Sequence, residues 1–309
     1  MKDEMRSRDV DEPGGLVLAI SAYLLWGGLP LYMKMMDHMD PGEIVAHRIL
    51  WSIPVAAMVL LVMGRWTDLW EALQDRRRLG MALLTAVLIS VNWLTYVVAI
   101  STERALDAAL GYYVNPVFSI VLAAVFLKER MQRLQVVAFA LVIGAVVVLT
   151  LEHGSLPWTV ILLTVSWGLY ALAKRALPMP PNQGFLLEVI LLAPLALAYL
   201  VWLDDGLVNH FLDGSGFDRW LLIGCGAVTA VPLILYANGA QRVRLMTMGI
   251  LQYIAPSCIF LTAVFAFNEP FTWAKQIAFP MIWLAVILYV LSQWHHGRQR
   301  RLKVGQAAE

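Results

Sequence analysis

The chain has 309 residues, of which 60% are hydrophobic and only 15% are charged. A soluble domain carries roughly 25% charged residues, so the deficit indicates a membrane protein with several spans. The net charge of +1 gives no reason to expect a nucleic acid or another highly charged partner. The two cysteines, Cys225 and Cys258, both lie in apolar stretches, which argues against a disulfide framework.

Ten apolar stretches of membrane length follow a charged tail at residues 1–14. The first shows no evident cleavage site, so we expect a retained helix rather than a signal peptide. The longest connections, 64–78 and 204–218, are too short to hold a soluble domain. The predicted spans are 15–34, 42–63, 79–100, 105–127, 133–151, 157–175, 184–203, 219–240, 245–267 and 272–294, before a basic tail at 295–309.

The second half of the chain repeats features of the first half at a shift of 140 residues. Tyr113 and Pro116 fall on Tyr253 and Pro256, and the same shift places Tyr96 on Tyr236, Arg104 on Arg244 and Glu129 on Glu269. Each half, 15–151 and 157–294, holds five predicted spans. Because five is odd, the halves must have opposite orientations, an arrangement found in secondary transporters. We therefore predict an all-α membrane protein of ten transmembrane helices in two inverted five-helix repeats.

The basic residues predict the orientation, because they gather in cytoplasmic loops. Of the 23 lysines and arginines, 18 fall in the two tails and in every second loop, and only Arg104 falls in the alternate loops. We expect both termini to be cytoplasmic and the protein to lie in a bacterial inner membrane.

Ionisable residues are rare in the spans, and each is a candidate for function. Glu43, His47 and Arg48 open the second span, and Glu188, in the seventh, falls on Arg48 at the 140-residue shift. They are a candidate substrate-binding or proton-responsive set, with His47 able to titrate near neutral pH. Alternatively, the residues of the second span reach the outer membrane interface, where their charges are solvated.

Polar side chains gather in four further spans, three of which also contain a proline, and a proline frees a backbone carbonyl for other partners. They could line a cavity for a small amphipathic solute, or serve only to bond helices together. These candidates are Asn92, Trp93, Tyr96, Tyr112, Asn115, Tyr236, Asn238, Gln252 and Tyr253. Pro116 and Pro256, with Gly27 beside Trp26 and Gly168 beside Trp167, are candidate hinge or gate positions, and close helix packing explains the glycines equally well.

No motif predicts an enzyme or a bound cofactor. The chain has no phosphate-binding loop, no metal-ligand spacing and no nucleophile–base set. The expected partners are therefore a small-molecule substrate and the lipid bilayer, with a proton as the candidate coupling ion. A monomer and a homodimer are both compatible with the sequence.

Several segments together resemble the RarD type of EamA-domain permease, in the drug/metabolite transporter superfamily. The resemblance runs from Gly15 to about Trp294 and rests on Tyr23 with Trp26-Gly27, Glu43 to Arg48 with Trp51-Ser52, Asn92-Trp93, Leu110 to Tyr112 with Asn115-Pro116, Leu127 with Glu129-Arg130, Pro232-Leu233 and Gln252-Tyr253 with Pro256. It implies alternating access around a cavity lined by helices one, three, four, six, eight and nine, with the fifth and tenth peripheral. From it we carry over Tyr96, Asn115, Tyr236 and Tyr253 as cavity residues, and note Asn238 as unusual for the family.

The sequence thus favours a permease that exports small amphipathic metabolites or drugs. An exchanger or uptake permease for amino acids or other zwitterions is the alternative, with Arg48 and Glu188 as its charged pair. A non-transporting membrane sensor or partner subunit is the rival from another class.

Overall fold

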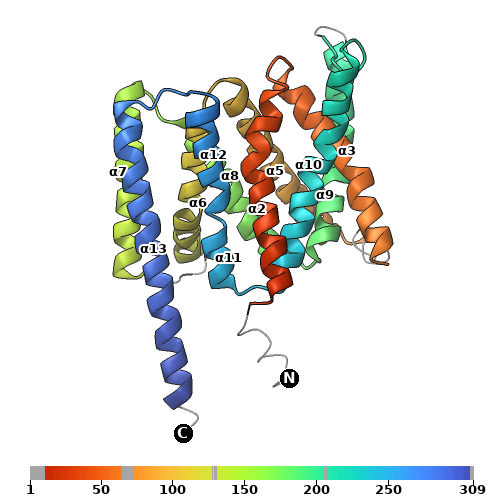
Figure 1. Cartoon of the computed structure of the whole chain (residues 1–309). Coiled ribbons are helices and arrows are strands. Elements are labelled where there is room, and N and C mark those ends of the chain that lie inside the picture. The colour runs from red at the N-terminus through yellow and green to blue at the C-terminus, as the bar shows by residue number, and fades with distance from the viewer. Residues whose placement is uncertain (1–10, 65–72, 127, 129–130, 205–207, 307–309) are drawn as a thin grey trace.

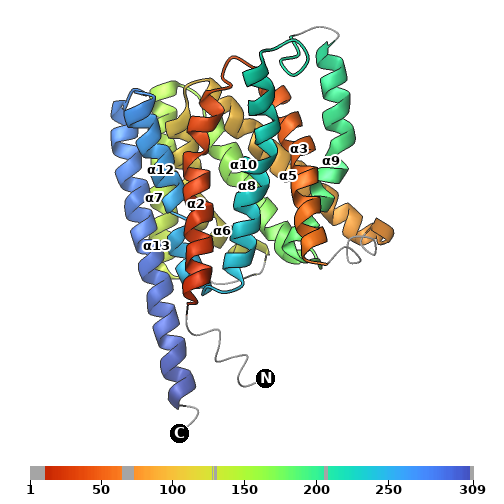
Figure 2. The ribbon, with the colours of Figure 1, turned by 45° about the vertical axis from the view of Figure 1, so that its right-hand side comes forward.

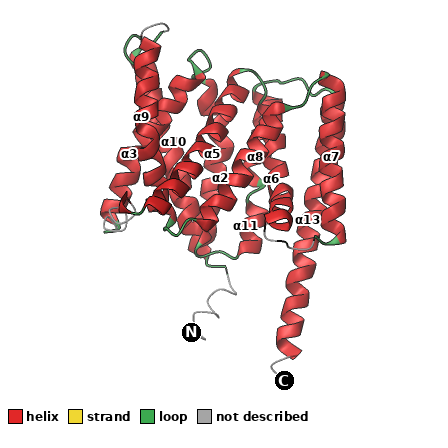
Figure 3. Ribbon diagram, turned by 180° about the vertical axis from the view of Figure 1, so that it is seen from behind, coloured by secondary structure: helices red, strands yellow, loops and turns green. Residues whose placement is uncertain are grey.

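The computed structural model describes residues 11–64, 73–126, 128, 131–204 and 208–306. In these residues the spans are helical, apart from a break in the ninth, and the chain contains no strand (Figures 1 and 3). Its elements are α2 (Pro13–Lys34), α3 (Pro41–Val62), α5 (Arg76–Ser101), α6 (Ala105–Phe126), α7 (Arg133–His153), α8 (Trp158–Ala176), α9 (Pro181–Asp204), α10 (Gly216–Ala240), α11 (Leu245–Leu251), α12 (Ile254–Leu261), a π-helical turn (Thr262–Ala266) and α13 (Trp273–Gln306).

Nine of the described segments are long and apolar enough to cross a membrane, and Trp158–Lys174 in α8 is a shorter apolar helix. Together they occupy the ten predicted spans. Large apolar side chains such as Val17, Leu195 and Trp220 are well exposed on the outer surface of the bundle. That exposure suits contact with lipid, which solvates apolar side chains as well as a protein core does.

Local sequence explains where several helices begin and end. Pro13 and Pro41 are the first residues of α2 and α3, where a missing N–H costs nothing. Asp40 caps α3 by accepting hydrogen bonds from the N–H groups of Gly42 at 2.8 Å and Glu43 at 3.1 Å. Gly154 ends α7 in the left-handed conformation, with φ of +67°.

The ninth span is broken where the sequence placed a proline. Pro256 has no N–H group to donate to the carbonyl of Gln252, four residues earlier. The chain leaves the helix at Gln252 and Tyr253, between α11 and α12. Pro116, at the matching position of the first half, leaves α6 continuous.

The helices pack with α7 beside α13 at one edge of the bundle and α3 beside α9 toward the other (Figures 1 and 2). The resemblance had implied that the fifth and tenth helices, α7 and α13, are peripheral. Between the edges, α2 packs on α10 and α12, while α8 packs on α5 and α6. The first helix of each half thus packs on the third and fourth helices of the other half. An internal twofold repeat requires this pattern. The inverted repeat itself stays a prediction.

Glu269 joins the two halves at the end of the bundle where α2 ends. Its side chain accepts hydrogen bonds from the first backbone N–H groups of α6, at 2.6 Å from Ala105 and 2.9 Å from Leu106. Beside it, Lys275 at the start of α13 pairs with Asp107 at 3.4 Å. Burial raises the pKa of Glu269 above its ordinary value, although both backbone hydrogen bonds oppose the shift. Glu129, its counterpart in the repeat, lies outside the described residues.

Candidate functional site

A cavity of ≈ 130 Å³ lies among the helices of both halves. Helices α2, α3, α5, α6, α8, α10 and α12 contribute its walls, together with the break between α11 and α12. The lining residues are Tyr23, Trp26, Leu29, Arg48, Asn92, Trp93, Tyr96, Tyr112, Asn115, Trp167, Tyr236, Gln252, Ala255, Pro256 and Ile259. The six lining helices implied by the family resemblance all contribute, and Arg48 adds the second helix to them.

Most of the polar candidates from the sequence line this one cavity. They are Arg48, Asn92, Trp93, Tyr96, Tyr112, Asn115, Tyr236 and Gln252, joined by the candidate hinge Pro256. The remaining candidates, His47, Glu188, Asn238, Tyr253, Gly27, Pro116 and Gly168, lie elsewhere. Whether the lining residues bind a substrate stays a prediction.

One wall of the cavity is a run of aromatic rings in contact. Trp26 of α2 lies with its ring centroid 5.6 Å from Tyr23, 5.6 Å from Tyr236 and 6.4 Å from Trp167. Trp167 continues the run to Tyr112 at 6.4 Å. The matched Trp26 and Trp167 of the two halves therefore meet at the cavity. Such a wall offers large, rigid apolar surfaces with a few polar edges.

Asn92, beside Tyr112 of this aromatic run, connects three helices at the cavity. Its amide nitrogen donates to Ser166 Oγ at 3.0 Å and to the Leu163 carbonyl at 3.2 Å, and its oxygen accepts from Tyr112 Oη at 3.1 Å. These contacts hold α5 against α8 and α6. Because Asn92 is fully engaged, helix bonding explains its presence without any ligand.

Arg48 is held differently. Its side chain is 3% exposed and its Nε donates to Thr229 Oγ1 at 3.0 Å. The guanidinium carbon lies 5.0 Å from the centroid of the Trp93 ring, a cation–π distance. Its Nη1 is buried with no hydrogen-bond partner, as are Tyr96 Oη and Asn115 Oδ1 on the same cavity wall.

The sequence left open whether Glu188 pairs with Arg48, and in the structure it does not. Its Oε1 accepts from Lys174 Nζ at 2.6 Å, and its Oε2 accepts from Tyr170 Oη at 3.3 Å. Lys174 also lies 5.7 Å from the centroid of the Tyr170 ring. The sequence gives no signal that links Lys174 to Glu188, because Lys174 is one of the basic residues at the end of a predicted span.

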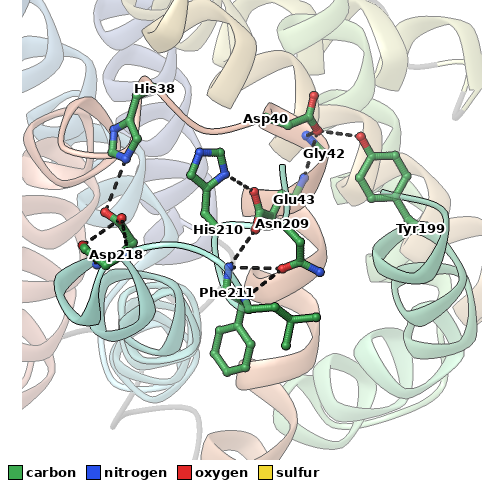
Figure 4. Close-up of polar contacts among 11 residues, drawn as sticks. His38, Asp40, Gly42, Glu43, Tyr199, Asn209, His210, Phe211 and Asp218 are labelled. Carbon is green, nitrogen blue, oxygen red and sulfur yellow. Dashed lines mark hydrogen bonds and ion pairs between the residues drawn. The ribbon is translucent and has the colours of Figure 1, made fainter. Parts of the chain in front are cut away.

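The acidic start of α3 belongs to a separate polar cluster at the end of the bundle (Figure 4). Glu43 is fully buried, with Oε2 2.8 Å from His210 Nδ1 and Oε1 accepting from the Phe211 N–H at 3.2 Å. His47 stacks on Phe211, with ring centroids 4.8 Å apart, and its Nδ1 accepts from Trp51 Nε1 at 3.2 Å. Glu43, His47 and Arg48 are all buried, so the idea that they reach a solvated interface is wrong.

The other candidates have local explanations. Asn238 donates to the carbonyl of Ile234 in its own helix at 2.8 Å. Tyr253 stacks on Tyr113, with centroids 6.2 Å apart, and these are the residues that the 140-residue shift pairs. Its hydroxyl is buried without a hydrogen-bond partner.

Gly27 and Gly168 lie at close helix crossings. A Cβ on Gly27 would come within 2.5 Å of Cys258 Cβ, and a Cβ on Gly168 within 2.6 Å of Phe118 Cδ1. Close packing therefore accounts for both glycines. A hinge motion at Gly27, Pro116, Gly168 or Pro256 stays a prediction.

Some lining residues were missed by sequence reasoning. Tyr23 lies one helical turn before Trp26, so its position on the same face of α2 was a usable signal. Leu29, Ala255 and Ile259 are apolar and look like any other packing residue of a span. Among the described residues, no group of three or more histidines, cysteines or carboxylates is placed to hold a metal ion.

Comparison with known proteins identifies the family. The profile of the EamA-like transporter family matches residues 13–151. The "Uncharacterized transporter YojE" of Bacillus subtilis is 38% identical over 282 residues, which cover 90% of this chain and 94% of that protein. "Protein RarD" of Escherichia coli is 35% identical, over 92% of this chain and 96% of RarD. The chain belongs to the EamA-like transporter family.

Within that family the chain is a RarD-type permease, as the sequence motifs predicted. A "Chloramphenicol-sensitive protein RarD" of Pseudomonas aeruginosa is more distant, at 28% identity over 93% of this chain and 96% of that protein. A solved structure titled "Crystal structure of protein" matches with a TM-score of 0.61 at 19% identity, covering 90% of this chain and 97% of that one. That likeness concerns the all-helical fold alone. The chain is thus a multi-pass membrane transporter, and family membership points away from an enzyme.

Proposed function

We propose that this EamA-like protein is a secondary transporter that exports small amphipathic metabolites or drugs by alternating access at the central cavity. The observation that carries the proposal is the cavity itself. Both halves contribute to it, and it combines an aromatic wall with buried polar atoms that lack protein partners. The positive-inside pattern supports a bacterial inner membrane with both termini cytoplasmic.

Exchange or uptake of a zwitterion through an Arg48–Glu188 pair is less well supported. Glu188 is engaged by Lys174 and Tyr170, and no carboxylate lines the cavity in the described residues. The candidate proton carriers His47 and Glu188 also lie outside the cavity. A coupling proton would therefore act through the helices that carry these residues rather than directly on the solute.

A cavity-filling variant tests the proposal. Ala255→Trp places a large ring in the cavity, while Val17→Trp places the same ring on α2 at a position that is 63% exposed. Cells that make equal amounts of each protein are compared by untargeted mass spectrometry of the medium. We expect some compounds to be released by the unmodified protein and by Val17→Trp but not by Ala255→Trp.

Two results would contradict the proposal. Equal release by the Ala255→Trp protein would show that the solute does not pass through this cavity. Release that never exceeds that of cells without the protein would support the sensor or partner-subunit alternative instead.

A further inference from the structure

We infer that the solute carried through this cavity is a small organic anion, whose carboxylate or similar oxyanion binds Arg48 and whose ring or apolar body lies against the aromatic wall. The inference rests on the proposed function and names its substrate class. It depends on the charges, the unpaired donors and the size of the cavity.

Arg48 differs from the other buried charged side chains that the structure describes. Each of the others has a charged or backbone partner: Glu43 with His210, Asp107 with Lys275, Glu188 with Lys174, and Glu269 with two N–H groups. Arg48 has one hydrogen bond, to the uncharged Thr229. A buried charge without a counter-ion is costly, and in a membrane span it marks a functional site.

The cavity carries one formal charge, and it is positive. Among its lining residues only Arg48 is ionised at neutral pH, and none is Asp or Glu. Because the surroundings are apolar, the field of the guanidinium is weakly screened. A cationic solute would be repelled, whereas an anion would supply the missing counter-charge.

The unpaired donors suit an oxyanion. Arg48 Nη1 and Tyr96 Oη can each donate a hydrogen bond, and neither has an acceptor in the protein. Trp93 lies beneath the guanidinium and is one turn from Tyr96 on α5, so the two donors share one region of the wall. A planar guanidinium with a second donor beside it matches the geometry of a carboxylate.

The size and aromatic wall limit the rest of the solute. An apolar cavity of about 150 Å³ accepts a benzene molecule, and this cavity has a volume of ≈ 130 Å³. The rings of Tyr23, Trp26, Trp167 and Tyr236 can pack against one such ring. The apolar part of the monoanion is therefore limited to one ring or a short chain.

Benzoate, benzamide and benzylamine test this assignment, because they share a ring but carry a negative, a zero and a positive charge at neutral pH. Binding to the purified full chain in lipid nanodiscs is followed by the fluorescence of the cavity tryptophans and by calorimetry. We expect benzoate to bind about 10- to 100-fold more tightly than benzamide, the gain of hydrogen bonds to a charged group. Benzylamine should bind most weakly.

Variants of Arg48 give the second readout. Arg48→Gln should abolish the preference for benzoate over benzamide, and Arg48→Lys should retain part of it. Arg104→Gln is the control, because that side chain is exposed outside the spans. The comparison of benzoate with benzamide on the unmodified protein does not depend on any variant folding.

The outcomes separate this inference from the proposed function. If benzoate binds no better than benzamide, or if the preference for benzoate survives in Arg48→Gln, the anion assignment is wrong. The transporter proposal would still stand if compounds were released by the unmodified protein but not by Ala255→Trp. If no compound is released through the cavity, the transporter proposal fails and the anion assignment fails with it. Released compounds that all carry an anionic group would support both.

Discussion

Lys174 and Glu188 form an ion pair, with Nζ 2.6 Å from Oε1, in which the carboxylate is buried and the lysine side chain is 20% exposed; the pair lies apart from the cavity containing Arg48. The pair joins α8 to α9, and Tyr170 completes it by donating to the second carboxylate oxygen. The repeat in the sequence places Glu188 opposite Arg48, but the fold gives the two residues different partners. Glu188 therefore contributes to the packing of the second half.

The stability losses from removing the two members of this pair should not add. Lys174→Met leaves the buried Glu188 carboxylate without its counter-ion, and we expect a loss of about 3–5 kcal/mol. Glu188→Gln should cost less, because the Lys174 side chain that it leaves is 20% exposed. The double variant should lose clearly less than the sum of the two. Thermal unfolding in detergent measures all three, and additive losses would contradict the pairing.

Thr229 should orient Arg48 without changing its charge. Thr229→Val removes the acceptor of the Nε hydrogen bond, and we expect the preference for benzoate over benzamide to fall by about tenfold or less. Thr95→Val is the matched control, because that hydroxyl bonds only to the Val91 carbonyl of its own helix. Unchanged selectivity in Thr229→Val would show that Trp93 alone positions the guanidinium.

Two neighbouring glycines of α2 should respond in opposite ways to alanine. Gly27→Ala would press its Cβ against Cys258, and we expect a loss of about 1–3 kcal/mol from overpacking. Gly28 has no atom within 4 Å of such a Cβ, so Gly28→Ala should be neutral or stabilising by up to about 1 kcal/mol. Melting temperatures of the two variants decide this, and equal effects would contradict the close packing of Gly27 against Cys258.

Glu269 should make stability depend on pH in a particular direction. Burial raises its pKa above the ordinary value of 4.5, so the folded protein holds this proton more tightly than the unfolded chain. The resulting stability is fully present below pH 4.5 and is lost as the pH rises through the folded-state pKa. Melting curves across this window should slope less in Glu269→Gln than in the exposed control Glu103→Gln, and identical slopes would refute the assignment.

The fold was largely predictable because apolar length alone marks a membrane span. All ten stretches are helical, with ends within a few residues of those expected in most cases. The break at Gln252–Tyr253 follows from Pro256, but the same argument applied to Pro116 predicts a break that α6 does not have. A proline frees a carbonyl in both helices, so the proline alone does not determine whether the helix breaks.

The cavity was partly predictable for a similar reason. Polar and aromatic residues stand out in a span, so Tyr96 and Gln252 could be selected from the sequence. The sequence does not show which face of each helix points toward the cavity. Glu188 and Tyr253 were candidates for this reason, but both lie outside the cavity. Apolar lining residues such as Leu29 carry no signal that separates them from packing residues.

The cap that Glu269 places on α6 has a consequence for biosynthesis. Ala105 and Leu106 precede Glu269 by 164 and 163 residues, so the start of α6 enters the membrane long before its hydrogen-bond acceptor has been translated. Until then two N–H groups at the end of a nascent helix must rely on water or lipid headgroups. If the first half were translated alone, the two N–H groups at the start of α6 would keep no acceptor from Glu269. The first half therefore depends on the second half for this helix cap.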